Sequence, residues 1–367
     1  MKITAAVVHE KNGPFRIENL ELAEPIRGEV LVRVAASGIC QTDVHARDGY
    51  FPIQYPAVYG HEGAGIVERV GPGVEKVKPG DPVIMVFPSC GKCPNCLQGK
   101  PSYCYEVARL KNHGTRADGS TVMSQNGKVV FSCFFQQSSL ATFSIATERN
   151  VVKVPKDVPL EILAAFPCGV NTGAGAVLNL LRPQPGDAFA VFGAGTVGSA
   201  ALMAARIAGC NPIMAVDIHP HRLEIARSLG ATHTIDAAKN DPVAEIRSLT
   251  GGLGVRASLE AAGSPKALRQ AVDSLQSLGT CVLVGSSRKG TEVSIDMNVL
   301  QGGRMVRGCI QGDSIPDQFI PRLVELHRAG KLPVERLITH YDFAEINRAV
   351  ADSIAGKTIK PVLRMPK

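Results

Sequence analysis

Four cysteines stand close together in the sequence at spacings that suit a metal ion. Cys90, Cys93, Cys96 and Cys104 form the pattern C-x2-C-x2-C-x7-C, with glycine, proline and asparagine between them where the chain must turn. Four thiolates complete the tetrahedral shell that zinc prefers and leave no position for a substrate, so the pattern predicts a structural zinc lobe at about residues 88–105. A bacterial iron–sulfur cluster has a different fourth spacing, and a zinc ribbon for nucleic acid usually separates its two CxxC pairs by a longer interval. Both alternatives fit less well.

Three further residues, far apart in the sequence, could form a second metal site. Cys40 ends the strand-like run LVRVAASGIC, His61 lies among small residues in GHEGAG, and Cys168 lies in FPCGVNTGAG near an expected domain boundary. Taken singly, each has an ordinary alternative as a buried thiol or a hydrogen-bonded core histidine. Together they supply two thiolates and one imidazole, which leave a fourth zinc position for water or substrate and so predict a catalytic zinc site.

A glycine motif predicts a dinucleotide site. Gly193, Gly195 and Gly198 follow the apolar run AFAVF and enclose Thr196 and Val197 at the start of a helical pattern. The three glycines would allow a tight turn, close approach of a pyrophosphate, and close packing of helix on strand, with the pyrophosphate at the helix N-terminus. The alternative is a glycine-rich turn in an unrelated fold.

An acidic residue after the next apolar run favours NAD over NADP. Asp217 lies 19 residues after Gly198 and ends the run PIMAVD. A carboxylate at this position bonds the ribose hydroxyls and repels a 2′-phosphate, although Asp217 could instead cap a helix. Arg222 could bind the same ribose or lie on the helix surface.

The elements that would position these residues differ between the two parts of the chain. The first part is β-rich, with strands predicted at Glu29–Ala35, Gly65–Val70 and Asp81–Phe87 and a long surface loop over residues 107–137. After about Cys168, short apolar runs alternate with helical patterns, which predicts a parallel sheet covered by helices. The predicted strands of this part are Ala188–Phe192, Ile213–Val216, Thr232–Ile235, Ala257–Leu259 and Thr280–Val284, and the predicted helices are Val197–Ala208, His221–Leu229, Asp241–Leu249 and Lys266–Leu275. A last strand at Lys360–Leu363 would return to the first domain.

Length and composition indicate a globular protein of two domains. The chain has 367 residues, of which 45% are hydrophobic and 20% charged. The net charge of +7 comes from scattered basic residues, so we expect no basic surface that binds nucleic acid. We see no secretory signal and no apolar run long enough for a membrane span, so we expect a soluble, cytoplasmic protein without a membrane partner. In that compartment ten cysteines are metal ligands or buried thiols.

The motifs together resemble a known family. GICQTD, GHEGAG, CGKCPNC with Cys104, PCGVNTG and GAGTVG occur in the order found in zinc-containing medium-chain alcohol dehydrogenases, and the resemblance covers essentially the whole chain. FFQQSSLATFSIATERNVVKV, DQFIPRLVELHRAGKLP and GKTIKPVLR make it most similar to the benzyl (aryl) alcohol dehydrogenases and related terpene alcohol enzymes. The resemblance implies an α/β fold, with a GroES-like β-rich catalytic domain (1–169 and 311–367) and a Rossmann domain with a doubly wound parallel sheet (170–310).

The resemblance also implies an activity. The chain would use two zinc ions and NAD to move a hydride between a primary alcohol and its aldehyde, and would act as a homodimer or homotetramer. Aryl or allylic alcohols would be the small-molecule substrates. The alternatives are an aliphatic alcohol or polyol dehydrogenase, a zinc-free quinone reductase relative, or a non-catalytic zinc protein that binds a dinucleotide.

Individual roles follow from the family by position. Cys40, His61 and Cys168 match the catalytic zinc ligands, with Glu62 beside the histidine. Asp43 matches the carboxylate that orients that histidine, Thr42 the hydroxyl that bonds the substrate oxygen, and His45 the surface end of a proton relay. Thr172 matches the residue beside the nicotinamide, Lys360 a basic residue for the pyrophosphate, and Gln41 a position where many relatives have arginine. Phe51, Phe87 and Ile310 are the expected pocket residues, with ordinary core packing as their alternative.

Overall fold

The computed structural model describes residues 1–366 and divides the chain into two compact units. The first unit comprises residues 1–168, 315–321 and the chain from 338 onward, and the second comprises 169–314 and 322–337. The expected domain boundaries differ from these units, since the first unit resumes at residue 315 and not at 311, and residues 322–337 lie with the second unit. Residues 311–314 stay with the second unit because Asn171 and Asn179 donate side-chain hydrogen bonds to the carbonyls of Gln311 and Gly312.

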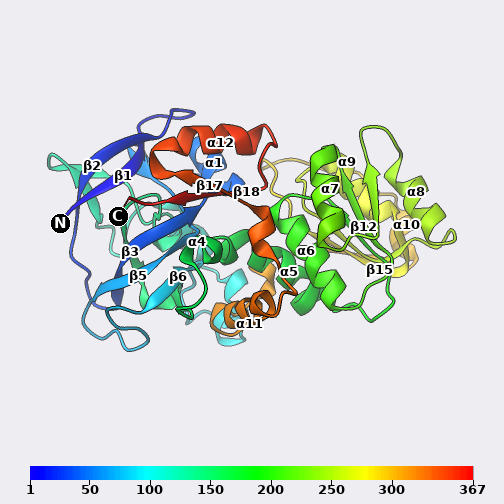
Figure 1. Cartoon of the computed structure of the whole chain (residues 1–367), viewed down its shortest axis with the longest axis horizontal. Coiled ribbons are helices and arrows are strands. Elements are labelled where there is room, and N and C mark those ends of the chain that lie inside the picture. Colours follow the sequence, from blue (N-terminus) through cyan, green and yellow to red (C-terminus); the bar gives the residue numbers. More distant parts are fainter. Residues whose placement is uncertain (367) are drawn as a thin grey trace. The chain divides into compact units, whose positions relative to one another are not determined.

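Two sheets make up most of the first unit (Figure 1). The first has the order β4-β1-β2-β7-β8, and the second has the order β10-β6-β5-β3-β18-β17, with β9 also paired to β3. The strands are β1 (Lys2–Val8), β2 (Arg16–Leu22), β3 (Glu29–Gly38), β4 (Ala57–Val58), β5 (Gly63–Val70), β6 (Pro82–Met85), β7 (Met123–Gln125), β8 (Lys128–Val130), β9 (Phe143–Thr147), β10 (Val151–Lys153), β17 (Ile338–Asp342) and β18 (Lys360–Arg364).

Strand β3 is the central element of the larger sheet. It pairs antiparallel with β5, β9 and β18, and its EVLVRVAASG sequence is buried on both faces over most of its length. The β-branched valines suit a strand that packs against neighbours on both sides. The predicted strands at Glu29–Ala35, Gly65–Val70 and Asp81–Phe87 all exist, and Lys360–Leu363 does return to pair with β3.

The prediction of one long surface loop over residues 107–137 was wrong. This segment contains α3 (Val107–Asn112), the hairpin of β7 and β8, and the short turn η2 (Phe134–Gln136). The hairpin turns at Asn126-Gly127, both with positive φ, which is the turn that an Asn-Gly pair favours between two short strands. The remaining helical segments of this unit are α1 (Gln41–Arg47), α2 (Pro94–Leu97), α4 (Leu160–Leu163), α12 (Ile346–Ile354), η1 (Pro101–Tyr103), η3 (Glu148–Asn150) and η8 (Phe343–Glu345).

A six-stranded sheet, parallel throughout, forms the second unit. Its order β13-β12-β11-β14-β15-β16 corresponds to the 3-2-1-4-5-6 order of the Rossmann fold. The strands are β11 (Phe189–Phe192), β12 (Ile213–Asp217), β13 (His233–Asp236), β14 (Val255–Glu260), β15 (Leu275–Leu283) and β16 (Met305–Gly308). The apolar runs of the sequence are the buried inner strands, as predicted, whereas β16 was not anticipated because all four of its residues are exposed.

Helices of this second unit follow the strands in alternation. They are α5 (Asn171–Gly175), α6 (Thr196–Ile207), α7 (Pro220–Leu229), α8 (Pro242–Leu249), α9 (Pro265–Asp273) and α10 (Met297–Gln301), with the shorter turns η5 (Ala176–Leu181), η6 (Gln311–Asp313) and η7 (Val334–Leu337). The π-helical turn η4 (Phe166–Val170) and helix α11 (Pro316–Arg328) each contain residues of both units. The four helices predicted from periodicity correspond to α6, α7, α8 and α9.

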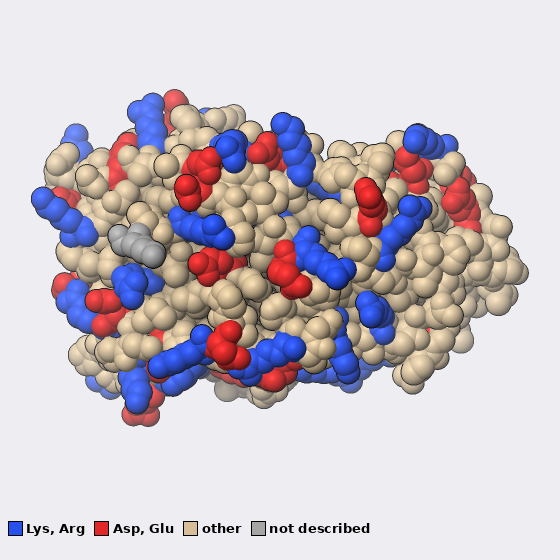
Figure 2. All heavy atoms as spheres, viewed as in Figure 1, with Lys and Arg blue, Asp and Glu red and all other residues tan. Residues whose placement is uncertain are grey.

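Charge on the surface is mixed in sign. Figure 2 shows lysine and arginine side chains interspersed with aspartate and glutamate on the face in view. No helix within residues 1–366 is long and apolar enough to cross a membrane.

Candidate functional site

The structure brings Cys40, His61 and Cys168 together in the first unit. Cys40 follows β3 and caps the N-terminus of α1, His61 directly precedes Glu62 and β5, and Cys168 lies in the turn η4. One ligand atom from each of these three residues and from Glu62 lies within 4.8 Å of the others. The two sulfur atoms are 3.9 Å apart, close to the roughly 3.8 Å between two thiolates that share a tetrahedral zinc.

The ring of His61 is oriented by a buried carboxylate. Its Nδ1 lies 2.8 Å from Oδ1 of Asp43, and Asp43 also accepts hydrogen bonds from the backbone N–H groups of Cys40 and Gly60. The other ring nitrogen, Nε2, is buried and has no hydrogen-bond partner among the described residues. A buried nitrogen without a partner is costly unless a ligand satisfies it, so the donor set fits a zinc ion.

Electrostatics in this cluster also favour a bound cation. Although burial opposes it, Asp43 and the Cys40 thiolate raise the pKa of His61 to about 10. A hydrogen bond from Cys168, together with His61, holds the pKa of Cys40 well below its usual value, while the same sulfur pair raises the pKa of Cys168. The cluster thus attracts positive charge, and a metal ion bound there would displace the protons.

Glu62 and Lys360 form an ion pair that is buried beside the cluster. Lys360 Nζ lies 2.6 and 2.9 Å from the two carboxylate oxygens and 3.3 Å from the carbonyl oxygen of Ile39. Burial raises the pKa of Glu62 to about 7, against the opposing effect of Lys360. Burial alone would lower the pKa of Lys360, but the attraction of Glu62 and Cys40 raises it overall.

The position of Lys360 corrects one expectation. We expected its ammonium to bind the cofactor pyrophosphate, but the side chain is only 2% exposed and its ammonium contacts Glu62 and the carbonyl of Ile39. In this structure it does not offer its charge to a phosphate. Space for the pair depends on Gly38, because a Cβ there would lie 2.0 Å from Oε2 of Glu62.

An aromatic wall, formed by Phe134 and Phe135, packs on His61. The Phe135 ring stacks on the imidazole with centroids 4.4 Å apart, and Phe134 meets it edge-on at 5.8 Å. Phe135 has a φ of +52°, an unusual backbone for a bulky residue and one that often marks functional sites. Sequence reasoning missed both residues, although the adjacent pair FFQQ was a visible aromatic signal.

The three expected pocket residues have different surroundings. Phe51 packs against Phe134 with ring centroids 6.3 Å apart, so it extends the aromatic wall. Phe87 is 4% exposed within the hydrophobic core of the first unit. Ile310 belongs to the second unit and is 42% exposed. Phe51 thus has a ring contact with the aromatic wall, and Phe87 belongs to the same core cluster as Phe134 and Phe135.

The expected relay residues lie on α1. Thr42 and His45 are partly exposed, whereas Gln41 at the helix start is exposed. The ring of His45 stacks on Tyr50 with centroids 4.5 Å apart. One helix therefore connects the metal cluster, through Cys40 and Asp43, with a histidine nearer the surface.

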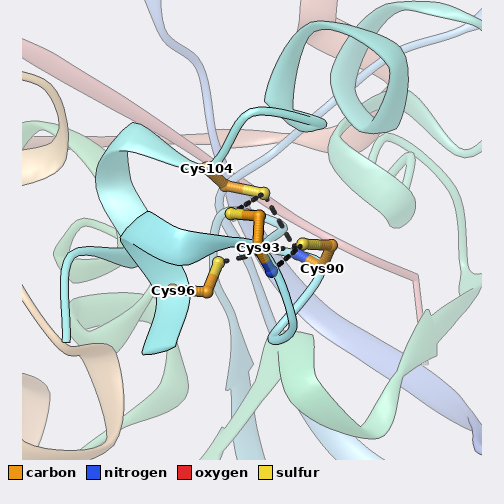
Figure 3. Close-up of side chains that lie close together, drawn as sticks. All are labelled: Cys90, Cys93, Cys96 and Cys104. Atoms are coloured by element: carbon orange, nitrogen blue, oxygen red, sulfur yellow. Dashed lines mark hydrogen bonds between the residues drawn. The ribbon is translucent and has the colours of Figure 1, made fainter. Parts of the chain in front are cut away.

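The second cysteine cluster has the geometry of a closed metal site. Figure 3 shows the sulfurs of Cys90, Cys93, Cys96 and Cys104 converging on one point, and all four lie within 4.8 Å of one another. The Cys90–Cys96 and Cys93–Cys104 sulfur pairs are 4.0 Å apart. Backbone N–H groups of Tyr105 and Cys96 lower the pKa of Cys93 to about 6, which favours a thiolate ligand.

The glycine motif of the second unit connects β11 to α6. Gly193 has a φ of +99°, and a Cβ on Gly198 would lie 1.8 Å from the carbonyl oxygen of Gly193, so both positions require glycine. A Cβ on Gly195 would meet no atom within 4 Å. Gly195 caps the N-terminus of the twelve-residue helix α6, where an anionic phosphate is favoured. The open space at Gly195 fits a dinucleotide pyrophosphate.

Asp217 ends β12 and is tied to this motif. Its Oδ2 accepts a hydrogen bond of 2.7 Å from the backbone N–H of Ala194, and its Oδ1 accepts one of 2.9 Å from His219. Arg222 lies 3.9 Å from the same carboxylate, and its Nε is buried without a partner among the described residues. Thr172 is buried near the start of α5. The carboxylate of Asp217 thus contacts the glycine motif, and the guanidinium of Arg222 lies beside that carboxylate.

Two domain families match the chain. Residues 26–156 match the alcohol dehydrogenase GroES-like domain, and residues 196–327 match the zinc-binding dehydrogenase family. Among curated proteins, the geraniol dehydrogenase of Castellaniella defragrans is 42% identical over 362 residues, which cover 98% of this chain and 96% of the relative.

Solved structures are similar along the full length. The benzyl alcohol dehydrogenase of Acinetobacter calcoaceticus is 43% identical with a TM-score of 0.97, and both chains are covered completely. An alcohol dehydrogenase zinc-binding domain protein from Burkholderia ambifaria is 47% identical with a TM-score of 0.98, again with complete coverage of both chains.

Proposed function

The chain belongs to the zinc-containing medium-chain alcohol dehydrogenases, and from this premise we propose that it interconverts aryl or allylic primary alcohols and their aldehydes with NAD. The observation that carries the proposal is the buried cluster of Cys40, His61 and Cys168, in which the Nε2 atom of His61 has no partner within residues 1–366. Two thiolates and one imidazole leave one position of a tetrahedral zinc for the substrate oxygen.

The cofactors supply the chemistry that side chains cannot. Zinc held by Cys40, His61 and Cys168 would polarise the alcohol oxygen, and NAD held at the glycine motif would accept the hydride. Asp43 fixes the tautomer and orientation of His61 so that Nε2 faces the cluster. The closed site of Cys90, Cys93, Cys96 and Cys104 would hold a second, structural zinc.

The chain itself handles the substrate proton. We assign Thr42 to the hydrogen bond with the substrate hydroxyl and His45 to the transfer of its proton toward the surface, because both lie on the helix that Cys40 begins. Glu62 and Lys360 keep a paired, buried charge beside the cluster. The attraction of Lys360 offsets part of the desolvation cost of keeping this carboxylate beside the metal site.

Asp217 supports the choice of NAD. Its carboxylate lies at the end of β12 and is held by the amide of Ala194 in the glycine motif. A negative charge at this position repels a 2′-phosphate and accepts hydrogen bonds from ribose hydroxyls. The guanidinium of Arg222 lies beside the Asp217 carboxylate, so the negative charge of Asp217 partly neutralises the positive charge of Arg222.

The aromatic wall supports an aryl or allylic substrate. Phe134 and Phe135 pack on His61 and Phe51 packs on Phe134, and flat apolar surfaces stack well on a benzyl ring or an allylic double bond. The names of two similar proteins, a geraniol dehydrogenase and a benzyl alcohol dehydrogenase, agree with this class.

A panel of alcohols tests the proposal. The enzyme would be assayed with benzyl, cinnamyl, geranyl, hexyl and ethyl alcohol and sorbitol, each with NAD and with NADP. We expect the highest kcat/KM for benzyl, cinnamyl or geranyl alcohol with NAD. A preference for ethanol or sorbitol would replace the substrate class with an aliphatic alcohol or polyol, and inactivity toward all six with one zinc per chain would favour a non-catalytic protein.

We also propose that the chain forms a homo-oligomer. The edge strand β16 is exposed along its whole length, and Met305 is 56% exposed. Met297 and Leu278 nearby in the same unit are 77% and 63% exposed. An unprotected edge strand among apolar side chains is a suitable surface for a second copy of the chain. Light scattering coupled to gel filtration checks this, with a monomer as the contrary result.

A further inference from the structure

Lys111 carries a positive charge next to the aromatic wall. It lies on α3, is partly buried, and holds Nζ 4.7 Å from the centre of the Phe135 ring. No acidic side chain within residues 1–366 forms an ion pair with it, whereas Arg109 on the same helix pairs with Glu106 at 2.9 Å. Burial lowers the pKa of Lys111. Because the described residues offer it no carboxylate partner, the ammonium can pair with an anionic ligand.

The ammonium lies close to the metal cluster through a short chain of contacts. Lys111 meets the Phe135 ring, and Phe135 stacks on His61 at 4.4 Å. The distance from Nζ to the centre of the His61 ring therefore cannot exceed the sum of those two separations. An aryl substrate whose ring extends from the metal cluster past the edge of Phe135 would bring a ring substituent within reach of Lys111.

The side chain of Gln136 holds α3 and the residues after it against the turn that carries Phe135. Gln136 donates from Nε2 to the carbonyls of Leu110, at 3.0 Å, and Thr115, at 3.3 Å. Phe135 and Gln136 both have positive φ, so the turn is constrained by its surroundings. The position of the ammonium over the ring thus results from the fold and does not require an ion pair.

We propose that Lys111 binds a carboxylate on the ring of the substrate, so that carboxylated benzyl alcohols and benzaldehydes are favoured; this inference rests on the proposed function. A partly buried ammonium whose aromatic neighbour supplies only weak attraction gains a strong, charge-assisted hydrogen bond from a carboxylate. An uncharged ring of the same size offers no such partner. Lys111 is in this role a specificity-determining residue.

Two substrates of matched shape test the proposal. Wild type, K111M and K111R would be assayed with 4-(hydroxymethyl)benzoate and with 4-methylbenzyl alcohol. K111M keeps the length of the side chain and removes its charge, so kcat/KM for the carboxylate should fall roughly 10- to 100-fold. The value for 4-methylbenzyl alcohol should change by less than about 3-fold. K111R should keep most of the preference because it keeps the charge.

A binding measurement separates recognition from chemistry. Calorimetry with 4-(hydroxymethyl)benzoate and the zinc-loaded enzyme saturated with NADH measures affinity without turnover. K111M should weaken this binding by a factor similar to its loss in kcat/KM. R109M is the matched control, because it removes a cation from the same helix, and it should leave the ratio between the two substrates unchanged. K111Q serves as a second neutral variant if K111M folds poorly.

The contrary outcomes are distinct. An equal loss for both substrates in K111M, or no change for either, would overturn the role of Lys111 while leaving the proposed function intact. If wild type oxidises neither benzylic alcohol but does oxidise hexanol or sorbitol, the proposed function itself is wrong.

Discussion

Asp43 shows how much one residue contributes to the site. It has no exposed surface and accepts three hydrogen bonds, from the backbone of Cys40 and Gly60 and from the ring of His61. It therefore connects the segment of one ligand to the side chain of another. Its i+3 position relative to Cys40 also lets it cap α1.

Replacing Asp43 by asparagine should impair the metal site without changing side-chain size. The amide cannot hold both backbone N–H groups and the same histidine tautomer, so D43N should lower zinc affinity or activity by roughly 10- to 100-fold. Zinc titration against a chelator measures the effect. D48N, at the end of the same helix and paired with Arg47, is the control and should behave like wild type.

Cys40→Ser should remove the catalytic zinc only. The hydroxyl is a much weaker zinc ligand than a thiolate, so turnover should be abolished and the zinc content should fall from about two per chain to about one. Binding of NAD, measured by calorimetry, should persist because the glycine motif is untouched. Full activity of this variant would contradict the zinc assignment.

Some site residues can be predicted from sequence and others cannot. The four closely spaced cysteines and the glycine motif identify their sites by spacing, and the combination of Cys40, His61 and Cys168 as a ligand set made those residues candidates from sequence alone. Lys111 and Phe135 are common residue types on short irregular elements, and their proximity to His61 depends on a turn with positive φ. Lys360 was recognised but given a role that its burial in the ion pair with Glu62 does not allow.

At the scale of elements, the turn between β11 and α6 combines two different demands on glycine. Gly198 is required by the fold, since a Cβ there would clash with the carbonyl of Gly193. Gly195 has free space around it and an ordinary negative φ, so the protein alone does not require glycine there. The absence of a side chain at Gly195 therefore matters only for a ligand that approaches the backbone.

Gly195→Ala should therefore separate stability from cofactor binding. The thermal midpoint should stay within about 2 °C of wild type, because the added methyl group meets no protein atom. Affinity for NAD should fall at least roughly 10-fold, because the methyl group would occupy the space of the pyrophosphate. G308A is the control, since Gly308 also has open space but lies on β16, and it should retain NAD affinity. Unchanged binding in G195A would contradict the placement of the pyrophosphate.

Regular elements were easier to predict than irregular ones. The inner strands of the parallel sheet are short apolar runs buried on both faces, and the helices between them have clear periodicity. The segment 107–137 lacks such runs. Its strands β7 and β8 are three residues long and lie at one end of a sheet, so few of their residues need to be apolar. Only the Asn-Gly pair at 126–127 signalled its hairpin.

At the scale of the whole molecule, the ion pair of Glu62 and Lys360 joins distant parts of the sequence. The two residues are 298 positions apart, and neither is more than 2% exposed. Lys360 begins β18, the strand that pairs with β3 ahead of Cys40. Strand β18 thus supplies a positive charge beside the cluster of Cys40, His61 and Cys168.

Lys360→Met should destabilise the first unit. It leaves the carboxylate of Glu62 buried without its partner, which typically costs about 3–5 kcal/mol. Chemical denaturation measures the loss. The double variant E62Q/K360M removes both charges and should recover part of it, whereas a K360M variant as stable as wild type would show that the pair contributes little.

The division of the first unit along the sequence has a consequence for biosynthesis. Residues 338 onward belong to this unit, yet the ribosome makes them only after the whole second unit. Domains usually fold as they emerge, N-terminal first. Strand β3 therefore cannot pair with β18, nor Glu62 with Lys360, until the whole second unit has been synthesised. The second unit, whose segments are nearly contiguous, can fold before the first is complete. In a nascent chain the second unit would therefore be folded while the first is still incomplete. Zinc supplied during translation could bind Cys40, His61 and Cys168 before β18 has been synthesised.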